Sequence, residues 1–368
     1  MLPPTSSPRI VSAPWPGLVA WGVGLRPTAA GLLIALISNG CAAPPPAART
    51  TDLAFQSIEQ TGRIKVSDYG VRAVGFSSDG ATLFTADAAG NLRSFESRTG
   101  RPLGPAVNHG YRSQIAFAPS GSLAVVATGY SLRMVDPVNG RTLRAIRIIS
   151  RYSGWHSGGL VVSADGSTAV MNTAENSVTA VGLSLGHLQT VDRNRRRSLP
   201  GLPLAISGNG EWAAFGDIRI ASLAIWNSIA DAVDTFDLRS LHGVRAATFY
   251  PDGKHLLVFT RDGERLVIEL TTMTRRFIST AKRVPEVNVV AASPAGEFFV
   301  TGHNDGSLAF WLNQTHRLGF ASKAHVGPIT SLAFSPDGNW LATVGADRQV
   351  TLWDLTALRG VELAARQP

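Results

Sequence analysis

Cysteine is almost absent from this sequence, whose 368 residues contain only one, Cys41. A single cysteine can form neither a disulfide within the chain nor a metal site built from several thiolates, so both are excluded. Charge is also sparse, because Asp, Glu, Lys and Arg make up 16% of the residues. The apolar run at residues 29–37 is far shorter than the roughly 20 residues that a membrane-spanning helix needs.

Signatures of catalysis and metal binding are missing as well. The chain has no GxSxG elbow, no Walker loop and no GxGxxG motif between a strand and a helix. None of its 8 histidines stands four residues from another. Asp231, Asp234 and Asp237 are spaced by three but lack the glycine and final glutamate of a calcium loop. The sequence therefore predicts a protein that is not an enzyme and that binds no metal or cofactor.

Residues 1–50 contain no acidic residue, and the first carboxylate of the chain belongs to Asp52. The apolar run at 29–37 is followed by Ser-Asn-Gly, then by Cys41, and then by the Pro/Ala stretch AAPPPAART. This order resembles a bacterial lipoprotein signal, although that family prefers a large aliphatic residue where Ser38 stands. The resemblance implies a signal peptide at 1–40, lipidation of Cys41, a tether at 41–54 and an envelope location. Soluble export and a cytosolic location remain alternatives.

Glycine, by contrast, recurs with a period. Seven tight-turn signatures each end in glycine and lie between two apolar runs, at Gly80, Gly121, Gly166, Gly210, Gly253, Gly296 and Gly338. Their spacing of 41 to 45 residues predicts an array of one supersecondary unit over residues 55–368.

The last repeat shows what that unit is. Apolar runs at 329–334, 340–344 and 350–355 are separated by turn residues, and each is four to seven residues long, which is typical of strands. Pro336 and Asp337 favour a turn, and Gly338 tolerates a positive φ. A more polar fourth strand, such as 141–148, completes each unit. Because four short strands cannot bury both faces of a sheet, neighbouring units must stack, and a closed ring protects the edges.

Repeat seven, AHVGPITSLAFSPDGNWLATVGADRQVTLWDL, resembles a WD-repeat blade, and the whole chain is similar to a seven-bladed all-β propeller of that family. The resemblance implies a buried structural tetrad formed by His325, Thr343, Asp347 and Trp353. Other repeats keep fewer of these residues: repeat six keeps Asp305 and Trp311 without a histidine before its first strand, repeat five keeps His242 and Asp262, and repeat four keeps Trp226. Repeats one to three carry Phe95, Val135 and Val181 at the tryptophan position. The resemblance also implies that residues 55–66 supply the outer strand of the last blade.

In this family the loops before the first strands commonly bind partners, which implies a protein-interaction scaffold. The candidate contact residues are Tyr69, Tyr111, Arg112, Trp155, His156 and His242. We expect a monomeric propeller with a protein partner and no nucleic acid, because the basic residues are not interleaved with exposed aromatic ones. The basic clusters are expected to be solvated, although they could attract an anionic surface; they are Arg141, Arg144, Arg147, Arg151, Arg193, Arg195, Arg196 and Arg197. A cytosolic WD-repeat adaptor and an extracytoplasmic propeller enzyme are the alternatives.

Overall fold

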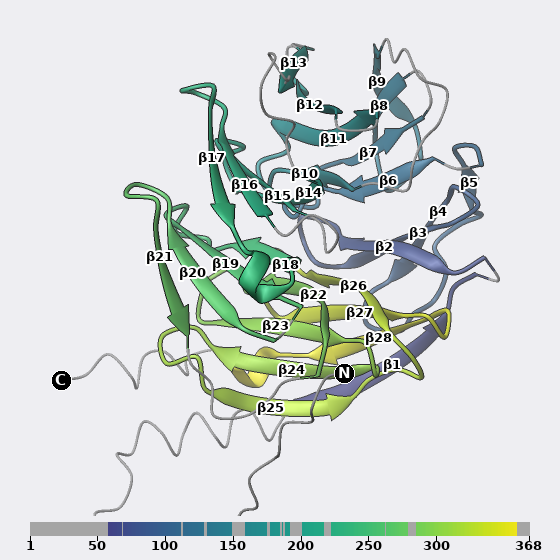
Figure 1. Cartoon of the computed structure of the whole chain (residues 1–368). Coiled ribbons are helices and arrows are strands. Elements are labelled where there is room, and N and C mark those ends of the chain that lie inside the picture. The colour runs from purple at the N-terminus through teal and green to yellow at the C-terminus, as the bar shows by residue number, and fades with distance from the viewer. Residues whose placement is uncertain are drawn as a thin grey trace, which may run out of the picture. The chain divides into compact units, whose positions relative to one another are not determined.

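In the computed structural model, the chain divides into two units, residues 1–43 and 44–368, and all described residues lie in the second. The structure describes residues 58–67, 69–111, 113–128, 131–148, 159–174, 177–184, 186, 188–191, 201–216, 222–261, 263–278 and 285–358. These residues form seven four-stranded antiparallel sheets (Figure 1). Within this part of the chain, no helix is both long and apolar enough to cross a membrane.

Blades one to four follow one another along the chain, each with its innermost strand first. Their strands are β2 (Val71–Phe76), β3 (Thr82–Asp87), β4 (Asn91–Glu96) and β5 (Val107–Asn108); β6 (Gln114–Phe117), β7 (Ala124–Ala127), β8 (Ser131–Val135) and β9 (Thr142–Arg147); β10 (Leu160–Val162), β11 (Thr168–Ala174), β12 (Ser177–Gly182) and β13 (Leu188–Val191); and β14 (Leu202–Ile206), β15 (Trp212–Gly216), β16 (Ser222–Asn227) and β17 (Ala232–Asp237). The expected fourth strand at 141–148 is therefore confirmed as β9.

Blades five to seven continue the same order, and two short 3₁₀ helices accompany them. The elements are η1 (Arg239–Leu241), β18 (Val244–Phe249), β19 (His255–Thr260), β20 (Arg265–Glu269) and β21 (Thr274–Ile278); β22 (Val287–Ala292), β23 (Phe298–His303), β24 (Ser307–Leu312) and β25 (Leu318–Lys323); and β26 (Ile329–Phe334), β27 (Trp340–Gly345), β28 (Gln349–Asp354) and η2 (Thr356–Leu358).

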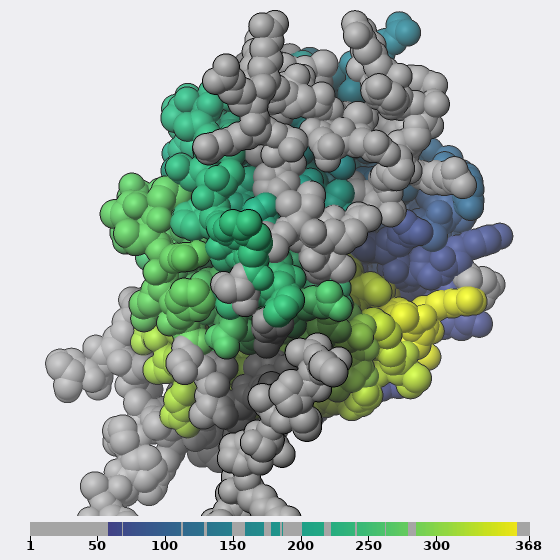
Figure 2. Space-filling view, viewed as in Figure 1, coloured from purple at the N-terminus to yellow at the C-terminus, as the bar shows by residue number. Residues whose placement is uncertain are grey.

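The ring is closed by the first strand of the chain. β1 (Glu59–Lys65) pairs antiparallel with β28 and completes blade seven, as expected for residues 55–66. The innermost strands contact one another in the order β2, β6, β10, β14, β18, β22 and β26, and β26 returns to β2. In Figure 2 the yellow surface of the last blade accordingly adjoins the purple surface of the first. The predicted seven-bladed β-propeller is confirmed.

The glycine-ended turns hold the first and second strands of each blade together. In blade seven the Ser335 hydroxyl donates to Asp337 Oδ1 (2.5 Å), and the Trp340 N–H donates to Ser335 Oγ (2.9 Å). Gly338 closes this turn at φ +73°. Blade one repeats the arrangement with Ser77, whose hydroxyl donates to the carboxylate two residues later. These turns form the edge of the ring opposite to the loops that precede the first strands.

A residue near the start of each third strand packs on the following blade. The residues at this register position are Leu92, Leu132, Val178, Leu223, Arg265, Leu308 and Val350, and all seven are buried. Val350 shares an apolar cluster with Phe95 of blade one, and Leu308 shares one with Trp353 of blade seven. Burial of these apolar side chains between blades is the main stabilising contribution to the ring.

Candidate partner-binding face

Three large apolar or aromatic side chains are exposed at the loops that precede the first strands of blades seven, one and two. Val326 is 78% exposed before β26, Tyr69 is 66% exposed before β2, and Tyr111 is 76% exposed before β6. Because β26, β2 and β6 are consecutive in the ring, the three side chains belong to neighbouring blades on one edge.

Basic side chains accompany them. Arg72 is the second residue of β2 and is exposed, as is Arg348 in the β27–β28 turn. That turn contacts the loop before β26, because the Ala346 N–H donates to the Pro328 carbonyl (2.8 Å). We call Val326, Tyr69, Tyr111, Arg72 and Arg348 together the docking arc.

Among the described residues, two carboxylates of the docking-arc blades are hydrogen-bonded within their own blades. Asp87 is buried and accepts a hydrogen bond from the Ser67 hydroxyl (2.6 Å), while Asp347 accepts from the His325 ring (3.0 Å). Burial opposes ionisation of Asp87, but hydrogen bonds from Ser67 and Asn91 outweigh it and hold its pKa below the usual value. Both carboxylates are therefore ionised near neutral pH, and they fix loops instead of offsetting the arginines at the surface.

The loops of the docking arc are held by backbone contacts. The Tyr69 N–H donates to Ser67 Oγ (3.1 Å), and the Val326 N–H donates to Asp347 Oδ2 (3.0 Å). The loop of Tyr111 lies so close to the β3–β4 turn that a Cβ at Gly90 would collide with the Gly110 carbonyl. Loops that are ordered before binding lose little conformational entropy when a partner docks.

The four residues of the implied tetrad lie in hydrogen-bond contact in blade seven. His325 Nδ1 donates to Asp347, and its Nε2 lies 2.8 Å from Thr343 Oγ1, which also accepts from Trp353 Nε1 (3.3 Å). Burial is the largest influence on His325 and lowers its pKa, although the Asp347 charge opposes the change. These contacts tie the loop before β26 to β27 and β28, and the second oxygen of Asp347 also accepts from the Val326 N–H.

Blade six has no histidine before its first strand, as expected, but a histidine from its second strand joins the tryptophan in a similar network. His303, at the end of β23, is fully buried; its Nε2 lies 2.9 Å from Thr301 Oγ1 and its Nδ1 donates to the Pro285 carbonyl (2.9 Å). Trp311 Nε1 donates to the same Thr301 hydroxyl (2.9 Å). Asp305, which the sequence assigned to this network, instead accepts from Ser307 at the surface.

Blades six and seven each place an imidazole ring near the same register position, but the ring comes from a different element in each blade. Gly345 and His303 occupy the same register position, since each pairs with the first residue of the inner strand. A Cβ at Gly345 would lie 2.5 Å from Cγ of His325, so blade seven needs glycine where its loop histidine enters. In blade six the strand itself supplies the imidazole.

The other residues predicted for a tetrad or a partner contact lie outside both the blade-seven tetrad and the docking arc. Trp226 of blade four donates to Asp231 in its own hairpin (3.2 Å). His242 is exposed at φ +55° before blade five, which is not adjacent to the blades of the docking arc, so the structure does not bring it together with Tyr69 and Tyr111. Several predicted positions lie outside the described residues: Cys41, Arg112, Arg151, Trp155, His156, Arg193, Arg195, Arg196, Arg197 and Asp262.

Sequence reasoning missed Val326, Arg72 and Arg348. In the loop of blade seven, the motif marks only the buried His325 and not the exposed residue beside it. Arg72 is the second residue of an inner strand, and the sequence predicts contact residues only in the loops before these strands. Val326 directly follows the motif histidine His325, and Arg348 directly follows the motif aspartate Asp347, so both could have been found as neighbours of tetrad residues.

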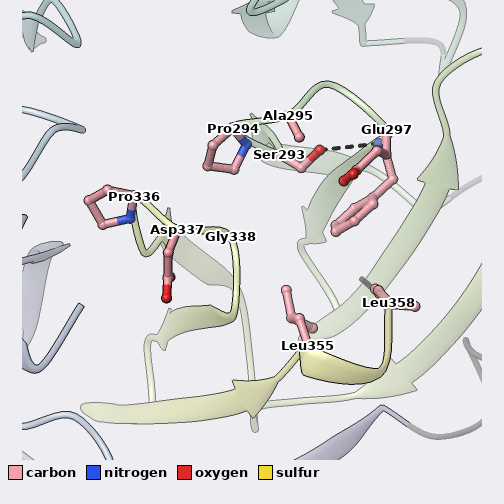
Figure 3. Close-up of a pocket in the computed structure, with 10 residues that line it drawn as sticks. Ser293, Pro294, Ala295, Glu297, Pro336, Asp337, Gly338, Leu355 and Leu358 are labelled. Carbon is pink, nitrogen blue, oxygen red and sulfur yellow. Dashed lines mark hydrogen bonds between the residues drawn. The ribbon is translucent and has the colours of Figure 1, made fainter. Parts of the chain in front are cut away.

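A hollow lies between blades six and seven on the edge formed by the glycine-ended turns (Figure 3). It is lined mainly by turn backbone, prolines and leucines, and its Asp337 accepts from Ser335 and Asn339. No histidine, cysteine or lysine is among the described residues that line it. Within residues 58–358, excluding the gaps, no three His, Cys, Asp or Glu side chains group as a metal site would require. The docking arc is therefore the stronger candidate site.

Comparison with known proteins agrees with the fold. The family described as WD domain, G-beta repeat matches residues 276–311 and 317–354. The second match begins beside β25 of blade six and ends with β28, so a sequence repeat is offset from a blade by one strand. The structure and these matches define the protein as a seven-bladed β-propeller that contains WD40 repeats.

Several curated proteins are similar over part of the chain. Striatin of Mus musculus is 26% identical over 144 residues, which cover 36% of this chain and 18% of striatin. The periodic tryptophan protein 2 homolog of Mus musculus is 28% identical over 195 residues, covering 41% and 21%. Meiotic recombination protein rec14 of Schizosaccharomyces pombe is 38% identical over 63 residues, covering 17% and 21%. The chain thus spans about a fifth of the length of the curated relatives it matches.

Proposed function

We propose that the protein is a protein-interaction scaffold whose partner binds the docking arc. The observation that carries this proposal is the exposure of Tyr69, Tyr111 and Val326 on three consecutive blades. Tyrosine and arginine are over-represented among residues that dominate binding energy, because they combine a large contact area with hydrogen-bonding groups. A single exposed apolar residue needs no explanation, but exposed apolar and aromatic residues on three consecutive blades, accompanied by exposed arginines, support an interface.

The charge of the docking arc points to the chemistry of the partner. Arg72 and Arg348 are exposed, while Asp87 and Asp347 are engaged within their own blades. A partner segment with carboxylates beside an aromatic or aliphatic anchor would match this surface, since complementary charge favours the correct partner and speeds association.

Affinity purification from the producing cells tests the proposal. The wild-type protein, a Tyr69→Ala/Tyr111→Ala variant and a Phe277→Ala control are used as baits, with co-purifying proteins quantified by mass spectrometry. Phe277 is half exposed on the outer strand β21, so its loss removes a comparable apolar group away from the docking arc. We expect partners to be lost only with the tyrosine variant. Loss with Phe277→Ala instead would place the interface on the outer strands.

We further propose that Cys41 is lipidated and anchors the propeller in the cell envelope through the Pro/Ala tether. The support is the sequence alone: the apolar run at 29–37, the small residues before the cysteine and the Pro/Ala stretch after it. The intact mass of membrane-extracted protein is compared with that of a Cys41→Ala variant. A mature mass beginning at Cys41 with an added lipid, absent from the variant, is expected. A full-length, unmodified and soluble protein would instead favour the cytosolic adaptor.

A further inference from the structure

One of the seven inter-blade contacts is chemically unlike the others. At the register position where six blades place leucine or valine, blade five places Arg265, which is fully buried. Its guanidinium carbon lies 4.4 Å from the centre of the Trp311 ring of blade six. An aliphatic residue would fill this position at no electrostatic cost, as it does in the other six interfaces, whereas a buried cation loses its hydration.

The pairing of this guanidinium leaves one edge open. Nη1 donates to the backbone carbonyl of His316 (3.4 Å), but Nε and Nη2 are buried and have no acceptor among the described residues. The Nε–Nη2 edge presents two parallel N–H groups, which is the fork that binds two oxygens of a carboxylate or phosphate. No described carboxylate forms an ion pair with Arg265.

Other polar atoms around Arg265 are also buried without a partner. The Tyr250 hydroxyl and His316 Nδ1 each lack a hydrogen bond within the described structure. Tyr250 belongs to the same apolar cluster as Trp311. His316 stands at φ +53° in the turn between β24 and β25 and is partly exposed, as a rim residue would be.

Both arginines and carboxylates act on the residues of this region. Arg265 and the exposed Arg276 of β21 both act on Tyr250 and His316. Burial lowers the pKa of Arg265 to about 10, so it stays charged at neutral pH. Burial, followed by the two arginines, lowers the pKa of His316 to about 4, so that ring is neutral. The exposed Glu264 acts on Arg265 without forming an ion pair with it among the described contacts, and Asp252, which acts on Tyr250, is already paired with His255 (2.6 Å).

We propose that the interface between blades five and six is a binding site for one small inorganic oxyanion of the phosphate type. The Nε–Nη2 edge of Arg265 holds two of its oxygens, the Tyr250 hydroxyl donates to a third, and the exposed Arg276 adds positive charge. The anion supplies the acceptors that this buried fork lacks and offsets its charge. It enters at the turn of His316, the only partly exposed member of the group besides Arg276.

Calorimetric titration of the full chain with inorganic phosphate tests this site, alongside thermal unfolding in phosphate and in chloride at equal ionic strength. Arg265→Leu restores the aliphatic residue of the other six interfaces, and Arg265→Lys keeps the charge while removing the fork. Arg275→Ala is the matched control, because this exposed neighbour on β21 donates to the Asp237 carbonyl on the side of blade four.

We expect saturable one-to-one binding by the wild type and the Arg275→Ala variant, with at least tenfold weaker binding by both Arg265 variants. Phosphate, but not chloride, should raise the melting temperature of the wild type. Equal shifts in the wild type and in Arg265→Leu, or no binding by the wild type at millimolar phosphate, would overturn the proposal. If Arg265→Leu fails to fold, phosphate binding by Arg265→Lys, compared with the wild type, tests the proposal in its place.

Discussion

At the scale of single residues, the buried polar positions show what a motif can and cannot predict. The four tetrad residues named from repeat seven lie in contact because all of them stand at the positions that the motif implies. The motif does not predict His303, because it places its histidine before the first strand. Its signal was present: it stands two residues after Thr301, where repeat seven has Gly345.

Substituting His303 tests the rebuilt network of blade six. We expect His303→Leu to lower the free energy of unfolding by about 1–3 kcal/mol, because it leaves the buried Thr301 hydroxyl and the Pro285 carbonyl without this partner. Asp305→Ala is the control, and it should change stability by less than about 0.5 kcal/mol because the side chain is at the surface. Urea unfolding measures both. A larger loss with Asp305→Ala would restore the network that the sequence suggested.

The buried histidines also predict how stability depends on pH. Burial is the main cause that lowers the pKa of His303, His325 and His316, the last to about 4, against an unfolded value of about 6.5. The unfolded chain therefore binds these protons first, so stability is fully present above about pH 6.5 and declines as the pH falls toward 4.

Urea unfolding at intervals between pH 7.5 and 4.5 measures this decline, and His316→Gln should flatten its slope. Unchanged stability across that range in the wild type would contradict the assignment of neutral, buried rings.

At the scale of strands and blades, the glycine period was enough to predict seven units, and each turn signature now lies between a first and a second strand. The outer strands were less predictable. Their lengths vary, since β5 has only two residues and β9 has six. They are hard to predict because outer strands are half solvated and show no regular alternation of apolar residues. The strand that closes the ring was located only through the resemblance to WD-repeat proteins.

Closure by β1 can be tested through Gly100. A Cβ at this position would lie 2.7 Å from Ile64 Cγ1 of β1, and the residue has φ +69°. We expect Gly100→Val to cost about 1–3 kcal/mol of stability through backbone strain and displacement of β1. Gly104→Val is the matched control, because no atom lies within 4 Å of its added Cβ. Equal melting temperatures for the two variants would mean that β1 does not need this close approach.

At the scale of the whole molecule, the ring places residues from distant parts of the sequence on one edge. Tyr69 and Val326 are separated by most of the propeller in sequence, yet β2 and β26 are in contact. The sequence named Tyr69 and Tyr111 as contact residues but grouped them with His242, because a list of equivalent loops does not say which blades are adjacent. Once the ring is closed, blades seven, one and two are neighbours, so Val326, Tyr69 and Tyr111 lie on consecutive blades.

Site-specific photocrosslinking tests the docking arc most directly. A benzophenone amino acid replaces Tyr69, Tyr111 or, as the control, Phe277 in the full chain, and the producing cells are irradiated before the adducts are identified by mass spectrometry. The account predicts the same partner protein at positions 69 and 111 and none at 277. Adducts at position 277 alone, or none at either tyrosine position, would contradict it.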